Sequence, residues 1–256
     1  MDAIVLRQFG KIITYTMQVS VVIPMAVTWW RWQQLPSVVR LLSLYTYVSL
    51  ACSMLSWLLH WMLMQGYIGN NYLGNFLFNT AAVALFMAVY YRSLSEPWRK
   101  RLVLGLGVAM LLLSLSLELG PDRRLAMSVA QTSGCAVLLA FALLYMDAFS
   151  AQRRQQPAAQ DPIYLLSIGL LIKSAGAIVT FSLQYFIMDA AQMDIVWMPV
   201  PFIGLLFNYY LTLAFLRARR PGPADKAGPA AGATRAGRPF THHPDLQSTL
   251  YNRPAG

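Results

Sequence analysis

The sequence predicts an all-α membrane protein, a seven-transmembrane helix bundle with its N-terminus outside the cell and its C-terminus in the cytoplasm. Hydrophobic residues make up 57% of the 256 residues and charged residues only 12%, whereas soluble domains usually carry about 25% charged residues. The apolar residues fall in runs of about 20, the length that crosses a hydrocarbon core of about 30 Å. The uneven placement of Lys and Arg between the connections predicts the orientation.

Seven apolar segments separated by polar connections form the predicted transmembrane domain, residues 1–216. They cover about 12–30, 41–64, 72–91, 102–119, 125–146, 163–187 and 195–216. The first segment is expected to be a true span rather than a signal peptide, because the residues before it do not form a basic head. Pro24 predicts a kink within this first helix.

Polar residues recur at helical spacing inside several of these segments. The second segment carries four of them on one face: Ser49, Ser53, Ser56 and His60. In the third segment, Asn75 and Asn79 lie one helical turn apart. Glu118 lies near the far end of the fourth segment, and Gln131 lies near the start of the fifth. Lipid cannot satisfy such groups, so these faces should be turned toward protein or water.

The sixth segment contains Lys173 in the middle of an otherwise apolar run. A lysine at that depth is costly and is by default a candidate functional residue. Small and polar residues share its helical stripe: Gly169, Ala177, Thr180 and Gln184. Counting 1.5 Å per residue from the helix ends places Lys173, Asn208 and Asn79 in one layer near the midplane.

A second polar layer is expected nearer the outer surface. Its members are His60, Asn75, Glu118, Gln131 and Gln184. Together the two layers predict an outward-facing polar pocket with Lys173 near its floor, suited to a small polar or anionic ligand. The alternative is that the amide side chains only bridge neighbouring helices, which is a common packing device in membranes.

The distribution of Lys and Arg predicts which connections face the cytoplasm. The connections after the first, third and fifth segments and the C-terminal tail together hold 15 of these residues. The N-terminus and the remaining connections hold 4, and Lys173 is the twentieth. The positive-inside rule therefore places the N-terminus outside, in a multi-pass protein of the cell (inner) membrane.

The C-terminal tail, residues 217–256, is rich in Pro, Gly, Ala and Arg. This composition cannot build a core, so the tail is expected to be disordered. Its basic residues suit anionic lipid heads or a cytoplasmic protein partner. The net charge of +10 is concentrated there and in the cytoplasmic connections, so nucleic acid is not an expected partner.

No residue pattern predicts a metal site, a cofactor or a catalytic residue. Cys52 and Cys135 both lie in apolar runs, away from metal-ligand spacing, and are read as packed thiols. Three hypotheses of function can be drawn from the sequence. An intramembrane enzyme with His60 and Glu118 as acid–base groups is the least supported of them, because no pair of groups has a diagnostic spacing.

A short internal sequence repeat, the triplet LFN, favours a transporter. The triplet Leu77–Asn79 recurs at Leu206–Asn208. The third and seventh segments would then correspond, giving a three-plus-one-plus-three arrangement of parallel repeats as in SWEET-type transporters. The favoured reading is a sensor or receptor-like bundle without an output domain of its own, and a small-solute transporter is the alternative.

The run DPIYLLSIGLLIKSAGAIVTFSL and the GNN turn before the third segment resemble a family of uncharacterised seven-helix membrane proteins frequent in Bacteroidota. The resemblance covers most of the second to seventh segments. This chain departs from it at Ala82 and Val200, where that family tends to carry Glu and His. Because that family has no known activity, the resemblance implies a fold and a compartment only.

Overall fold

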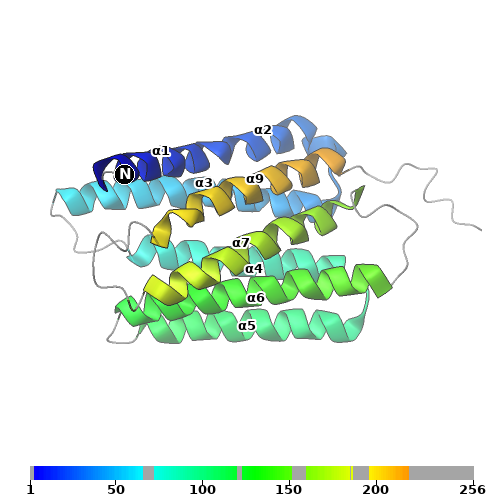
Figure 1. The fold of residues 1–256 in the computed structure, drawn as a ribbon. Coiled ribbons are helices and arrows are strands. Elements are labelled where there is room, and N and C mark those ends of the chain that lie inside the picture. Colours follow the sequence, from blue (N-terminus) through cyan, green and yellow to red (C-terminus); the bar gives the residue numbers. More distant parts are fainter. Residues whose placement is uncertain are drawn as a thin grey trace, which may run out of the picture. The chain divides into compact units, whose positions relative to one another are not determined.

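In the computed structural model, the described residues are 3–65, 72–119, 123–151, 160–184, 186 and 196–218. They are almost entirely helical (Figure 1). The helices are α1 (Ala3–Ser20), α2 (Val22–Arg31), α3 (Ser37–Met64), α4 (Tyr72–Ser93), α5 (Pro97–Glu118), α6 (Arg123–Ala151), α7 (Pro162–Gln184) and α9 (Pro199–Arg217). A single 3-10 turn, η1 (Trp32–Gln34), follows α2. Of the predicted tail, all but residues 217 and 218 lie outside the described residues.

The first two helices form one rod, which we call rod α1–α2. They are separated only by Val21, whose backbone stays helical at φ −63° and ψ −24°. Pro24 explains the interruption, because proline has no N–H to donate to the carbonyl four residues earlier, at Ser20. The irregularity thus lies one turn before the proline at which it was predicted. With this rod counted once, the described helices form seven rods.

Six helical stretches in the described residues are long and apolar enough to cross a membrane. They are Gln8–Gln34, Ser37–Leu59, Pro97–Glu118, Leu125–Ala151, Pro162–Leu183 and Pro199–Arg217. The prediction of an all-α, multi-pass membrane protein is confirmed to this extent. The predicted third span corresponds to α4, which is not among the six. This helix carries Asn79, Thr80 and Arg92 and packs against α3, α5 and α6, so much of its surface faces protein.

Six of the seven rods form a ring, and α5 lies outside it. Around the ring, rod α1–α2 contacts α3, α3 contacts α4, α4 contacts α6, α6 contacts α7, α7 contacts α9, and α9 returns to the first rod. The remaining rod, α5, packs against α4 and α6 (Figure 1). Its buried residues form one stripe at helical spacing: Arg99, Val103, Gly107, Met110 and Ser114. Most leucines on its other faces, such as Leu104, Leu112 and Leu115, are exposed, as expected for contact with lipid.

The ring is filled at one end and hollow at the other. Near the C-terminal ends of α4 and α9, large side chains fill the interior, among them Phe86, Tyr90, Phe141 and Phe215. Toward the ends where α4, α6 and α9 begin, the interior is not filled, and apolar side chains with a few amides and hydroxyls line a cavity there. Lys173 lies where the filled half meets the hollow half.

Near the filled end, Arg31 is paired with backbone carbonyls of the protein. Arg31 donates to the C-terminal carbonyls of α9, including Phe215 O at 3.1 Å and Ala218 O at 3.2 Å. Cations are favoured at helix C-termini because the last carbonyls lack partners there. These bonds hold the end of rod α1–α2 against the end of α9, where Figure 1 shows the two side by side.

The fourth predicted segment begins earlier than expected, at Pro97 instead of residue 102. Glu96 is extended (φ −75°, ψ 129°) and Pro97 takes the first helical position, where its missing N–H costs nothing. The basic residues assigned to a loop therefore begin the helix. Arg99 is buried and pairs with Glu96 at 3.2 Å and Asp147 at 2.7 Å.

Candidate functional site

The hollow half of the ring contains a cavity of ≈ 280 Å³. Its lining residues come from rod α1–α2, α3, α4, α6, α7 and α9, and among the described residues α5 contributes none. The walls are mostly aliphatic, aromatic and sulfur-containing, with a few amides and hydroxyls. This volume lies near the lower limit of ligand pockets in proteins, which measure about 300–1,000 Å³.

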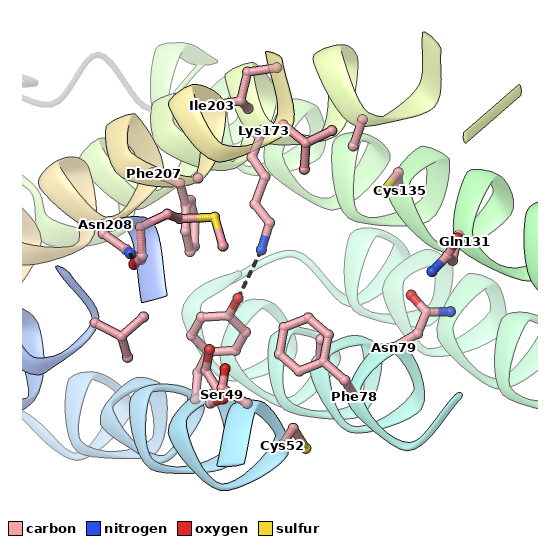
Figure 2. Close-up of a pocket in the computed structure, with 18 of the residues that line it drawn as sticks. Ser49, Cys52, Phe78, Asn79, Gln131, Cys135, Lys173, Ile203, Phe207 and Asn208 are labelled. Atoms are coloured by element: carbon pink, nitrogen blue, oxygen red, sulfur yellow. Dashed lines mark hydrogen bonds between the residues drawn. The ribbon is translucent and has the colours of Figure 1, made fainter. Parts of the chain in front are cut away.

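Lys173 is the only charged residue among the described residues that line this cavity. Its ammonium donates a hydrogen bond to the hydroxyl of Tyr45 at 2.8 Å. Nζ also lies 4.6 Å from the ring centroid of Phe207, 5.4 Å from that of Tyr45 and 5.7 Å from that of Phe78. Figure 2 shows the side chain crossing from its helix toward the opposite wall, between the two phenylalanines. Ring faces at these distances attract a cation.

The helical spacing of α7 explains why Lys173 points inward. Ala177, one turn later, also lines the cavity, and Gly169 and Thr180 on the same stripe are buried. Gly169 allows α7 to approach α9 closely, because a Cβ there would lie 2.7 Å from the Cβ of Tyr210. The predicted inward stripe is therefore observed in its described members, while the side chain of Gln184 lies outside the described residues.

Tyr45 is held in place by aromatic packing from three sides. Its ring lies 4.9 Å from Phe86, 5.8 Å from Phe207 and 6.2 Å from Phe78, and only 3% of the residue is exposed. The rigid ring presents its hydroxyl to the ammonium at a fixed position. The Lys173 ammonium therefore lies in an aromatic cage, which is formed by Tyr45, Phe78 and Phe207.

The two asparagines predicted to share a layer with Lys173 both line the cavity. Asn208 donates to Ser20 Oγ at 2.7 Å and lies within 3.4 Å of Met17 O, which ties α9 to rod α1–α2. Asn79 donates to Ala130 O at 3.1 Å, tying α4 to α6. Both amides bridge helices, as the packing alternative expected, and the polar partner of Lys173 is Tyr45 rather than either asparagine.

Of the predicted second layer, Gln131 lies at the cavity and Glu118 does not. Gln131 lines the cavity near Asn79 (Figure 2), and its buried Oε1 has no hydrogen-bond partner among the described residues. Glu118 lies at the end of α5, the rod that contributes nothing to the described lining. The side chains of His60, Asn75 and Gln184 lie outside what the structure describes.

Sequence reasoning missed the aromatic cage and the cavity positions of both thiols. Cys52 on α3 and Cys135 on α6 are free and line the cavity. In an apolar run, an inward-facing Phe or Cys cannot be told from one that packs elsewhere. The one sequence signal that pointed to the cage was the LFN repeat, because Phe78 and Phe207 are its central residues and both contact Lys173.

No group of three or more His, Cys, Asp and Glu residues in the described part of the chain could hold a metal ion. The chemistry that the cavity offers is hydrogen-bond donation from Lys173 and Tyr45, together with polar contacts from the amides and serines.

The fold and its apolar rods define a multi-pass helical membrane protein. In comparisons with known proteins, no family model, no curated sequence and no solved structure matches the chain. The resemblance to the seven-helix family of Bacteroidota therefore remains a hypothesis, supported only as far as a helical membrane protein with several apolar spans.

Proposed function

We propose that this protein is a receptor-like membrane sensor that binds a small ligand in the cavity beside Lys173. The observation that carries the proposal is the cavity itself, which lies between six rods and has a single ammonium among its described lining residues. A packing role alone would be served by filling this half of the ring, as the other half is filled. Ligand sites in helical bundles are commonly built in this way, from apolar walls and a few converging polar groups.

The orientation belongs to the same proposal. With the N-terminus outside, the hollow half of the ring faces the exterior of an inner membrane and the filled half faces the cytoplasm. The basic tail, residues 217–256, would then lie in the cytoplasm, where a protein partner or anionic lipid can reach it. A ligand that arrives from outside would thus be sensed by a bundle whose C-terminal segment is available for output.

The native thiols provide a direct test of ligand binding. The full-length Cys52→Ser variant, reconstituted in lipid nanodiscs, leaves Cys135 as the only cysteine. Its modification rate with methyl methanethiosulfonate is measured by mass spectrometry, against a panel of small carboxylates, amides, amines and sugars. We expect at least one class to slow modification of Cys135 and to raise the unfolding temperature. Unchanged rates across the whole panel would refute the proposal.

A small-solute transporter is the second candidate, and the ring geometry favours it specifically. The first three rods and the last three rods occupy consecutive halves of the ring, and the fourth, α5, lies outside. Phe78 and Phe207, the central residues of the LFN repeat, approach the same ammonium from the two halves of the ring. Such an arrangement fits two parallel repeats around a central site. Uptake of a protecting compound into proteoliposomes would favour transport, and saturable binding without flux would favour sensing.

A further inference from the structure

The geometry points to a ligand class: we propose that the cavity binds a small monocarboxylate with an apolar body, with its carboxylate on Lys173 and Tyr45. This inference rests on the proposed ligand-binding function and specifies what is bound. Unused hydrogen-bond donors, the apolar walls and the lack of an acidic residue in the described lining together favour this ligand.

The unused donors converge at one place. An ammonium has three donor hydrogens, and Lys173 uses one on Tyr45. Because the Tyr45 oxygen accepts this bond, its own proton is directed elsewhere, and no acceptor for it is found in the described part of the chain. Nζ and Oη are 2.8 Å apart, so the two oxygens of one carboxylate can accept from both groups at once. Charge-assisted hydrogen bonds of this kind are the strong ones.

The charge balance also favours an anion. None of the described residues lining the cavity is acidic, and the groups found around the ammonium are the Tyr45 hydroxyl and the rings of Phe78 and Phe207. Ring quadrupoles stabilise a cation only partly, whereas an anion in a low-dielectric site interacts with it far more strongly. A cationic ligand would meet the same ammonium without a compensating group.

The rest of the wall selects an apolar body. Beyond the aromatic cage, the cavity is lined by side chains such as Ala177, Phe181, Ile203 and Leu138. A densely hydroxylated ligand would leave most of its polar groups unpaired against these side chains, which is unfavourable. The Gln131 amide, whose Oε1 has no hydrogen-bond partner among the described residues, can satisfy one further polar group on the ligand.

The test uses three probes that share one shape: 3-phenylpropanoate, 3-phenylpropanamide and 3-phenylpropylamine. Full-length Cys52→Ser protein in nanodiscs is titrated with each probe, and the half-protecting concentration for Cys135 is measured. We expect the carboxylate to protect at a concentration at least about tenfold lower than the amide, because only the carboxylate brings a full negative charge to the ammonium. The amine should protect least.

Two variants and one control assign this preference to the proposed groups. Lys173→Met should abolish the preference for the carboxylate and leave protection by the amide nearly unchanged. Tyr45→Phe keeps the ring and removes the hydroxyl, so it should reduce the preference about threefold, and it carries the test if Lys173→Met does not fold. Lys100→Met removes a lysine on α5, outside the cavity, and should change nothing.

The outcomes separate the two proposals. Equal protection by amide and carboxylate, or a carboxylate preference that survives in Lys173→Met, would overturn the ligand class while leaving ligand binding intact. Absence of protection by any probe would contradict the ligand class as well, and the wider panel described above would then decide whether any ligand binds.

Discussion

At the scale of single residues, a glycine lets two neighbouring helices of this protein approach each other closely. Gly134 on α6 lies against the side chain of Asn79 on α4, where an added Cβ would lie 2.7 Å from Oδ1 and 3.0 Å from Nδ2. Asn79 in turn donates to Ala130 O one turn earlier on α6. The absence of a side chain at position 134 therefore makes room for a polar bridge at the cavity wall.

Gly134→Ala should destabilise the folded protein by about 1–3 kcal/mol, because it forces the Asn79 amide out of its position. Gly105→Ala on α5 is the matched control, since nothing lies within 4 Å of a Cβ there. That substitution should be neutral or stabilising by up to about 1 kcal/mol. Unfolding of both variants in mixed micelles measures the difference, and equal stability of the two would contradict the packing argument.

At the scale of the element, α7 depends on how it begins. Asp161 precedes Pro162, and its Oδ1 accepts from the N–H groups of Ile163 and Tyr164, both at 2.9 Å. The Tyr145 hydroxyl donates to the same carboxylate from α6 at 3.1 Å. One buried side chain thus satisfies the first free N–H groups of the helix that carries Lys173 and also ties that helix to its neighbour.

Asp161→Ala should reduce the stability of the folded protein by about 0.5–2 kcal/mol, the usual effect of losing an N-cap. Asp161→Asn retains an oxygen acceptor and is itself a good N-cap, so it should retain most of the stability. Thermal unfolding followed by circular dichroism compares the two variants. If both lost the same amount, the cap could not be what stabilises this end of α7.

At the scale of the whole molecule, exposed aromatic residues lie near both ends of the bundle. Trp29 and Trp30, at the end of α2, are 79% and 81% exposed. Trp57 and Trp61 are exposed near the end of α3, at the opposite end of the bundle, because α3 runs back along the first rod. Tryptophan is enriched at both membrane interfaces, so these residues bracket the predicted hydrocarbon region.

The orientation across the membrane can be tested with single cysteines in a Cys52→Ser/Cys135→Ser background. We expect Cys at Asn70 or Ala191 to react with an impermeant maleimide in intact cells. Cys at Ser95, in the short connection between α4 and α5, should react only after permeabilisation. The charge asymmetry between the connections is the physical reason. A reversed pattern at two of the three sites would overturn the orientation.

Local sequence alone determined the membrane character and most of the helices, because run length and hydropathy are properties of neighbouring residues. The predicted segment of residues 163–187 matches α7 closely at its start for this reason. The start of α5 was missed, since buried Arg99 looks like a loop residue until Glu96 and Asp147 are seen to pair with it. Periodicity also indicated correctly that Lys173 faces inward.

Only the tertiary structure decided what Lys173 faces and which rods enclose the cavity. Its partner, Tyr45, lies 128 residues away in the chain, and no local period relates the two. The exclusion of α5 from the ring was likewise not predictable, because its sequence is as apolar as that of its neighbours. Which rods become neighbours depends on side-chain packing between distant segments, such as Gly169 against Tyr210 and Gly134 against Asn79. That complementarity exists only once the helices have met.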